Sequence, residues 1–211
     1  DLDYSGNDIE VTVVVSDGVL TDSDTFSLDV LNLNDAPIVN AIANETIFED
    51  DTLILTVSGS DVDEEDEITF SASADQGALA SVDGNEISIT PELDFNGDIQ
   101  VSVIATDLAG ETGEATFTLA VLPVNDAPVI DIIDDQEINE DAIFILELSA
   151  SDVDGDELSY SASVNDYAFA SIDGSTLTVV PDLDYSGNDI EVTVVVSDGQ
   201  YTNQSVFNLA I

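Results

Sequence analysis

Short acidic motifs recur along the chain, and their oxygen atoms could bind a hard cation. Asn-Asp-Ala-Pro occurs at 34–37 and at 125–128, and Asp-Val-Asp occurs at 61–63 and at 152–154. Calcium takes six to eight oxygen ligands from carboxylates, amides and carbonyls, whereas magnesium prefers to keep its waters. Zinc favours His and Cys, and the chain contains neither. The chemistry that these motifs offer is therefore calcium binding.

The charge of the chain is entirely one-sided. It carries 47 Asp and Glu residues and no Lys, Arg or His, which gives a formal net charge of −47. Since no side-chain salt bridge can form, the balancing cations must come from outside the molecule. Nucleic acids and anionic membranes are excluded as direct partners, because binding to either depends on Lys and Arg. Direct membrane insertion is not expected either.

The same composition removes most catalytic chemistry. Without His, Cys or Lys there is no imidazole base, thiolate or Schiff-base amine. A carboxylate pair hydrolyses glycosides only in a cleft with sugar-stacking aromatic side chains, and Trp is absent. We therefore expect no enzymatic activity. No apolar run approaches the roughly 20 residues that span a membrane as a helix.

Internal repeats organise the chain. Residues 1–18 and 182–199 are identical, and the two Asn-Asp-Ala-Pro motifs lie 91 residues apart, which sets the period. Boundaries just before the motif prolines give 1–36, the C-terminal part of one repeat, and two complete repeats, 37–127 and 128–211. The junctions contain no Gly/Ser tract, so neighbouring repeats should abut.

The first 36 residues supply only the last two strands of a repeat. An isolated hairpin is marginal in water. We expect either that the chain was cut from a longer one or that neighbouring molecules complete this repeat. The absence of a basic segment at Asp1 also suggests an excised piece.

Alternating apolar and polar residues predict about seven short strands in each complete repeat. The clearest segments in the second repeat are 38–42, 53–57, 68–72, 87–89, 99–105 and 117–121. Those in the third are 130–133, 144–148, 158–162, 177–179, 190–194 and 207–211. Seven strands in about 90 residues indicate an immunoglobulin-like Greek-key sandwich. The predicted fold is all-β, with such sandwiches joined end to end in tandem.

Many carboxylates lie at the ends of the predicted strands. Asp107 and Asp198 follow the long strand of their repeats, and Asp94 precedes that strand in the second repeat. In a sandwich the loops gather at two poles. Stacking repeats end to end would bring the acidic loops of one repeat against those of the next.

These motifs resemble those of cadherin-like repeats over essentially the whole chain, most of all the tandem repeats of large bacterial surface adhesins with a Val-Asn-Asp-Ala-Pro linker. The resemblance implies calcium at each junction, bound by a first-strand acid, Leu-Asp, the Asn-Asp linker, Asp-x-Asp and a later aspartate. Between the first and second repeats the matching residues are Asp3, Asn34, Asp35, Asp61, Asp63 and Asp107. Between the second and third they are Glu49, Asp50, Asp94, Asn125, Asp126, Asp152, Asp154 and Asp198.

The motifs depart from the family pattern in two places. The linker lacks the second Asn, and the Glu expected after Leu-Asp is Ser5, Asn96 or Ser186. We expect one or two ions per junction in place of the family's three. Six carboxylates within about 6 Å would repel one another by on the order of 10 kcal/mol in total. Empty junctions should therefore splay and filled junctions should stiffen.

Other acids and aromatic residues have simpler interpretations. Asp98, Glu111 and Glu114 are expected to be solvated surface charges. Tyr4, Phe95 and Tyr185 are expected to be core or corner aromatics rather than ligand platforms.

The functional hypothesis is a calcium-rigidified spacer in a long secreted or cell-surface protein of a bacterium. Its partners would be calcium and the neighbouring repeats of the same chain. An alternative is the building block of a self-assembling extracellular filament or sheath, in which identical chains contact one another. A weaker alternative is a carbohydrate-binding accessory module.

Overall fold

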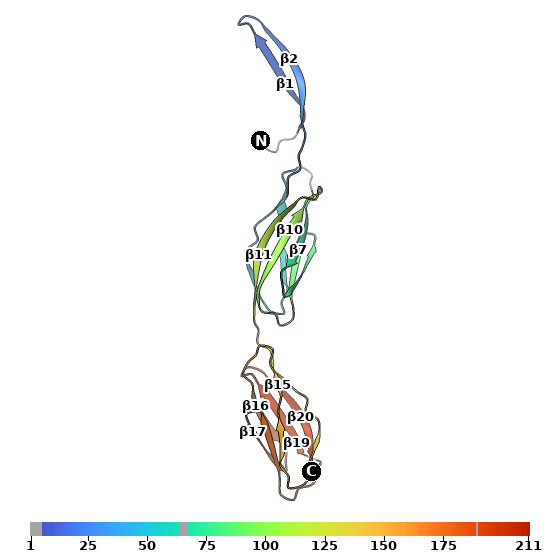
Figure 1. Cartoon of the computed structure of the whole chain (residues 1–211), viewed down its shortest axis with the longest axis vertical. Coiled ribbons are helices and arrows are strands. Elements are labelled where there is room, and N and C mark those ends of the chain that lie inside the picture. The colour runs from blue at the N-terminus through green and yellow to red at the C-terminus, as the bar shows by residue number, and fades with distance from the viewer. Residues whose placement is uncertain (1–5, 64–66, 189) are drawn as a thin grey trace. The chain divides into compact units, whose positions relative to one another are not determined.

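The computed structural model describes residues 6–63, 67–188 and 190–211. These residues form strands and loops (Figure 1), and no helix among them is long and apolar enough to cross a membrane. The chain divides into two compact units, Asp1–Pro123 and Val124–Ile211. The predicted ligand Asp3, together with Tyr4 and Ser5, lies outside the described residues.

The first unit contains a hairpin and one complete sandwich. The hairpin pairs β1 (Gly6–Ser16) with β2 (Thr21–Val30) in antiparallel register. The sandwich strands are β3 (Ile38–Val39), β4 (Glu45–Phe48), β5 (Leu53–Thr56), β6 (Gly59–Ser60), β7 (Thr69–Ala74), β8 (Ala78–Asp83), β9 (Glu86–Pro91), β10 (Gly97–Thr106) and β11 (Thr112–Leu122). One sheet has the order β4-β11-β10-β7 and the other has the order β5-β9-β8, with β3-β6 as a separate pair.

Two strands of this sandwich change partners along their length. β5 and β6 continue one another through Val57, whose N–H donates to Asn85 O at 2.8 Å, and Ser58, whose carbonyl accepts from Asn40 N at 2.9 Å. β3 and β4 likewise belong to one segment, which leaves β6 and then pairs in parallel with β11. Counting each broken strand once gives the seven strands that the sequence predicts, and the all-β tandem immunoglobulin-like fold is confirmed.

The predicted alternation places the apolar side chains of the second repeat in its core. Ile99, Val101, Val103 and Ala105 along β10 are all fully buried, as is Leu119 on β11. Burial of one such aliphatic side chain contributes about 1.5–3 kcal/mol. Phe95 packs against the same core, as its interpretation as a core or corner aromatic requires.

The second unit repeats the same architecture. Its strands are β12 (Val129–Ile130), β13 (Gln136–Glu137), β14 (Phe144–Glu147), β15 (Ala150–Ser151), β16 (Ser159–Val164), β17 (Ala168–Asp173), β18 (Thr176–Pro181), β19 (Ile190–Ser197) and β20 (Thr202–Ala210). The sheets have the orders β13-β20-β19-β16 and β14-β18-β17, with β12-β15 as a separate pair. Tyr185 packs against this core and stacks on Tyr167 at a centroid distance of 4.6 Å.

One sequence occupies two different environments in the chain. Val192, Val194 and Val196 of β19 are fully buried in the second unit. The equivalent residues of the identical first segment include Val13 and Val15 of β1, which are 58% and 65% exposed. The difference therefore arises from tertiary packing, because the local sequence is the same.

Candidate metal centres

The Asn-Asp linker of the second repeat is held at one pole of its sandwich by Asp107. Asp107 directly follows β10 and is only 6% exposed. Its Oδ2 accepts from Asn34 Nδ2 at 2.9 Å, and its Oδ1 accepts from the N–H groups of Gly110 and Glu111 at 2.6 and 2.8 Å. Gly113 on β11 also allows the linker to approach, since a Cβ there would lie 1.9 Å from Pro37 O. The turn after β10 thus positions the linker.

The Asp-Val-Asp loop after β6 completes this pole. Asp63 accepts from Asp35 N through Oδ2 at 2.8 Å and from Asn32 Nδ2 through Oδ1 at 2.7 Å. Asp61 Oδ1 accepts from Asp63 N at 3.0 Å, which fixes the loop. We call Asn34, Asp35, Asp61, Asp63 and Asp107 the first acidic pole.

The third repeat builds the same arrangement from the equivalent residues. Asn125 Nδ2 donates to Asp198 Oδ2 at 2.8 Å, and Asp126 N donates to Asp154 Oδ2 at 2.8 Å. Asp152 Oδ1 accepts from Asp154 N at 3.0 Å. We call these five residues the second acidic pole. Because the distances repeat nearly unchanged, the folded repeat holds this arrangement in both copies.

One oxygen in each pole is buried and has no hydrogen-bond partner among the residues that the structure describes. These atoms are Asp61 Oδ2 and Asp152 Oδ2, which occupy equivalent positions in the two repeats. Each is the second oxygen of a carboxylate whose Oδ1 is already bonded to the backbone of its own loop. A buried carboxylate oxygen with no donor is costly, by about 1–3 kcal/mol or more for a charged group. A cation at this point would remove that cost.

The hydrogen bonds of each pole keep its turn aspartate ionised. The Asn34 side chain lowers the pKa of Asp107 below its ordinary value, although burial opposes the shift, and backbone N–H groups of the turn assist. Burial also tends to raise the pKa of Asp198, but the bonds from Asn125, Gln200 and Tyr201 outweigh it and the pKa is lowered. Both carboxylates are therefore charged and available as hard oxygen ligands.

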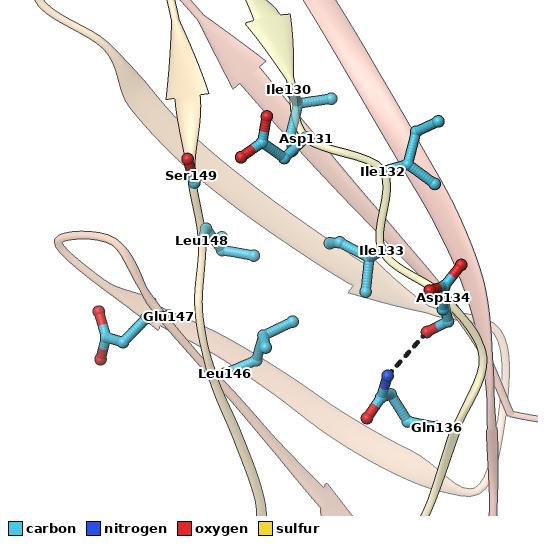
Figure 2. A pocket seen from close by; sticks show the side chains of 10 residues that line it. All are labelled: Ile130, Asp131, Ile132, Ile133, Asp134, Gln136, Leu146, Glu147, Leu148 and Ser149. Atoms are coloured by element: carbon cyan, nitrogen blue, oxygen red, sulfur yellow. Dashed lines mark hydrogen bonds between the residues drawn. The ribbon is translucent and has the colours of Figure 1, made fainter.

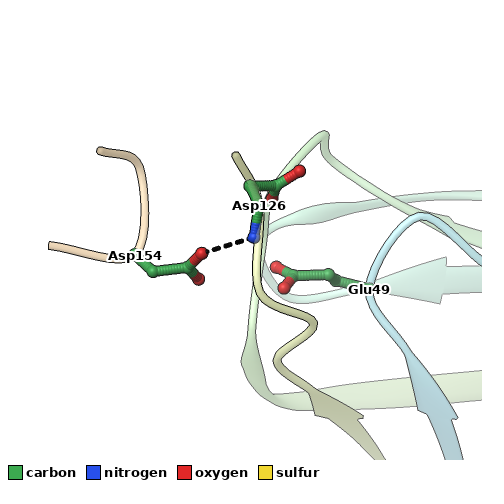
Figure 3. Close-up of side chains that lie close together, drawn as sticks. All are labelled: Glu49, Asp126 and Asp154. Atoms are coloured by element: carbon green, nitrogen blue, oxygen red, sulfur yellow. Dashed lines mark hydrogen bonds between the residues drawn. The ribbon is translucent and has the colours of Figure 1, made fainter. Parts of the chain in front are cut away.

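The first unit carries further predicted ligands near its C-terminal end. Glu49 is 4% exposed, and its N–H donates to Leu122 O at 2.9 Å, one residue before the unit ends at Pro123. Asp94 N donates to Asp50 Oδ1 at 3.4 Å, and both aspartates adopt positive φ. Figure 3 draws Glu49 of the first unit, and Asp126 and Asp154 of the second with the hydrogen bond between them.

The structure brings the predicted residues together in three groups. Each acidic pole gathers its five members, and Glu49, Asp50 and Asp94 gather at the end of the first unit. Asn32 was missed by the sequence analysis. The available signal was its position two residues before Asn34 in an Asn-x-Asn-Asp linker, which the third repeat replaces with Pro123. Asp98, Glu111 and Glu114 are exposed, as expected for solvated charges.

The donor set of each pole fits calcium better than other metals. It consists of aspartate carboxylates and one Asn amide, held by loops rather than by a rigid cage. Calcium accepts such oxygen ligands in variable geometry, whereas magnesium demands near-ideal octahedral positions and retains waters.

Comparisons with known proteins support the fold. The bacterial Ig domain family matches residues 34–120 and 125–209. Mouse cadherin-23 EC22–24 is 17% identical with a TM-score of 0.57, over 95% of this chain and 73% of that chain. Extracellular cadherin domains 1–4 of protocadherin gamma B7 are 19% identical with a TM-score of 0.51, over 97% of this chain and 57% of that chain.

An enzyme also contains a segment that matches this chain. An endo-fucoidan hydrolase from glycoside hydrolase family 107 is 15% identical with a TM-score of 0.37, and the match covers 99% of this chain. This chain spans about a third of that enzyme, because the match covers 34% of its length. The comparison with curated proteins gave no match.

Proposed function

The chain belongs to the bacterial Ig domain family, and we propose that it is a calcium-rigidified spacer segment of a long secreted or cell-surface protein. Tandem repeats of this kind indicate a structural or adhesive extracellular segment. In this proposal the repeats have no catalytic role. Their work is mechanical, and calcium is the partner that controls it.

The single observation that carries the proposal is the pair of buried carboxylate oxygens that have no hydrogen-bond partner in the described part of the chain. Asp61 Oδ2 and Asp152 Oδ2 occur at the same point of two repeats, each in a loop whose other aspartate, Asp63 or Asp154, accepts a hydrogen bond from the Asn-Asp linker. Since the chain contains no Lys, Arg or His, no side chain of its own can supply the missing positive charge. An external cation is the remaining source, and the oxygen-rich donor set favours calcium.

Chain connectivity links the second acidic pole to the ligands of the first unit. Leu122, whose carbonyl accepts from Glu49 N, lies only three residues before Asn125. A calcium ion held by Asn125, Asp152 and their neighbours could therefore also recruit Glu49 of the preceding repeat. Binding across this short linker would restrict the motion of one repeat against the next, which is what a spacer requires.

A calcium titration of the 211-residue chain tests the proposal. Thermal unfolding and small-angle scattering should be measured with a chelator, with calcium and with an equal concentration of magnesium. Calcium should raise the melting temperature and stiffen the chain, because a ligand at 100 times its Kd adds about 2.7 kcal/mol. Magnesium should have a smaller effect at these sites. A melting temperature and scattering profile that ignore both calcium and chelator would exclude the calcium spacer.

The filament alternative is favoured by a different observation. The β1–β2 hairpin exposes Val13, Val15 and Phe26, although the copies of the two valines in β19 are buried. If chains assemble through such faces, sedimentation velocity should show association that grows with protein concentration. A chain that stays monomeric at all concentrations, with and without calcium, would exclude this alternative.

A further inference from the structure

The linker at the first acidic pole contains a hydrogen-bond donor that the linker at the second pole lacks. Asn32 Nδ2 donates to Asp63 Oδ1 at 2.7 Å. Ninety-one residues later the equivalent position is Pro123, which has neither a side-chain donor nor a backbone N–H. The two poles therefore differ in a contact to the second aspartate of the Asp-Val-Asp loop.

This contact changes how the second aspartate of each loop is bonded. Asp63 accepts through both oxygens, because Asp35 N donates to its Oδ2 at 2.8 Å and Asn32 donates to its Oδ1. Asp154 accepts from Asp126 N through Oδ2 at 2.8 Å, but no donor among the described residues contacts its Oδ1. Asp63 is also partly buried, whereas Asp154 is exposed. One oxygen of Asp154 is thus open to a cation, and the matching oxygen of Asp63 is occupied by an amide.

We propose that Asn32 lowers the calcium affinity of the first acidic pole below that of the second. This inference rests on the calcium sites of the proposed function and concerns how they are tuned. To bind calcium through Asp63 Oδ1, the first pole must give up the Asn32 hydrogen bond, whereas the second pole gives up no such bond at Asp154. The net contribution of one intramolecular hydrogen bond corresponds to about a fivefold change in an equilibrium constant.

The same hydrogen bond holds the first linker in place when calcium is absent. In the first repeat the side chains of Asn32 and Asn34 and the N–H of Asp35 all donate to other aspartates of the pole. In the third repeat only the side chain of Asn125 and the N–H of Asp126 make the corresponding bonds among the described residues. The first linker should therefore keep its position at low calcium, and the second linker should depend more strongly on the ion.

Other acidic residues of the second unit provide an internal reference for this comparison. Figure 2 draws the carboxylates of Asp131 and Asp134 on opposite sides of the segment that joins β12 to β13, beside a pocket that Leu146 and Leu148 help to line. Because these two carboxylates do not converge, they do not form a donor set for one ion. Their amides should report only the general effect of calcium on an acidic surface.

The test is a calcium titration of the isotope-labelled 211-residue chain, followed residue by residue by NMR. The amides of Asp35 and Asp63 report the first pole, and those of Asp126 and Asp154 report the second. The second pole should bind calcium about fivefold more tightly than the first. In a chelator the Asp35 amide should exchange its hydrogen more slowly than the Asp126 amide, because Asn32 helps to fix the carboxylate to which Asp35 N donates.

Variants at the linker position separate this effect from other differences between the repeats. Asn32→Ala should raise the calcium affinity of the first pole about fivefold and, in the chelator, speed hydrogen exchange at Asp35. Pro123→Asn makes the reciprocal change and should weaken calcium binding at the second pole. Gln100→Ala is the matched control, because its amide donates to the neutral Thr118 hydroxyl at 2.7 Å, and it should leave both affinities unchanged.

The possible outcomes distinguish this inference from the spacer proposal. Equal affinities at the two poles, or an unchanged first pole in Asn32→Ala, would overturn the inference and leave the spacer proposal standing. Weaker calcium binding by Asn32→Ala would show the opposite role, in which the amide oxygen of Asn32 is itself a ligand. No calcium binding at either pole, or shifts at Asp131 and Asp134 that saturate together with those of the poles, would overturn both proposals.

Discussion

At the scale of single residues, a substitution at Asp152 tests whether this aspartate is a calcium ligand or only an acidic surface residue. Its Oδ2 is buried without a partner, while its Oδ1 is fixed by Asp154 N. Asp152→Asn should retain the loop bond through the amide oxygen and place a neutral group at the buried position. Without calcium the variant should be more stable by about 1–3 kcal/mol, because a neutral amide that can donate to a neighbouring carboxylate replaces a buried charged oxygen that has no donor. With calcium it should bind at least about tenfold more weakly, a loss of about 1.4 kcal/mol.

The matched control for this variant is Asp98→Asn, which removes one charge at an exposed position of β10. Surface substitutions of this kind usually change stability by less than about 0.5 kcal/mol. The two variants should therefore differ in stability, measured by calorimetric unfolding, and in calcium affinity, measured by calcium titration. If Asp152→Asn behaves like Asp98→Asn, the buried oxygen of Asp152 is not a calcium ligand.

The Asn34–Asp107 bond makes a separate prediction about protonation. Asn34 lowers the pKa of Asp107 below the ordinary value of 3.8. Since the unfolded chain then binds this proton more readily, the stabilisation is fully present above pH 3.8 and is lost as the pH falls through the lowered pKa. Asn34→Ala should raise the pKa of Asp107, as followed by carboxyl ¹³C NMR. Asp198 serves as the internal control, because its partner is Asn125, and an unchanged Asp107 would contradict the assignment.

At the scale of strands, alternation predicted the elements with large aliphatic residues at every second position and missed those with a weak apolar signal. β10 and β19 carry aliphatic residues at every second position, and these are buried. β8 and β17 present mainly Ala to the core, which gives a weak apolar signal. The breaks between β3 and β4 and between β5 and β6 depend on which neighbour each half pairs with, so no local pattern reveals them.

The sequence predicted which residues belong to the acidic poles, but not the hydrogen bonds that join them. The positions of Asp107 and Asp198 after a long strand placed them at the same pole of the sandwich as the linker motifs. The bonds from Asn34 and Asn125 that select one oxygen of each aspartate join residues 73 positions apart. Such pairings follow from the way the sandwich closes, so no local motif specifies them.

The two identical segments, 1–18 and 182–199, allow the effect of tertiary packing on amide hydrogen exchange to be measured directly. β19 lies within a complete sandwich, whereas β1 pairs only with β2 among the described strands. Hydrogen exchange should be slow for Val192 and Val194 and faster, by orders of magnitude, for Val11 and Val13, because an isolated hairpin is marginally stable. NMR resolves the two copies, and mass spectrometry can do so with peptides that extend past Val19 or Gln200. Equal protection of the two copies would mean that another protein segment packs on the hairpin in solution.

At the scale of the whole molecule, no basic side chain balances the formal net charge of −47. Only salt and bound cations can reduce the repulsion among the carboxylates. The screening length falls from about 30 Å at 0.01 M salt to about 3 Å at 1 M. The free energy of unfolding in a chelator should therefore rise with sodium chloride, opposite to the weakening that salt causes where attractive surface pairs dominate.

Calcium should reduce that salt dependence. Once the carboxylates of the two acidic poles are neutralised by bound ions, less repulsion remains for salt to screen. In a chelator we expect the melting temperature to rise by about 4–8 °C for each kcal/mol of repulsion relieved in a domain of this size. At saturating calcium the rise should be clearly smaller, and sodium perchlorate should act in the same direction as chloride if screening is the cause. An identical salt response with and without calcium would show that the repulsion lies outside the acidic poles.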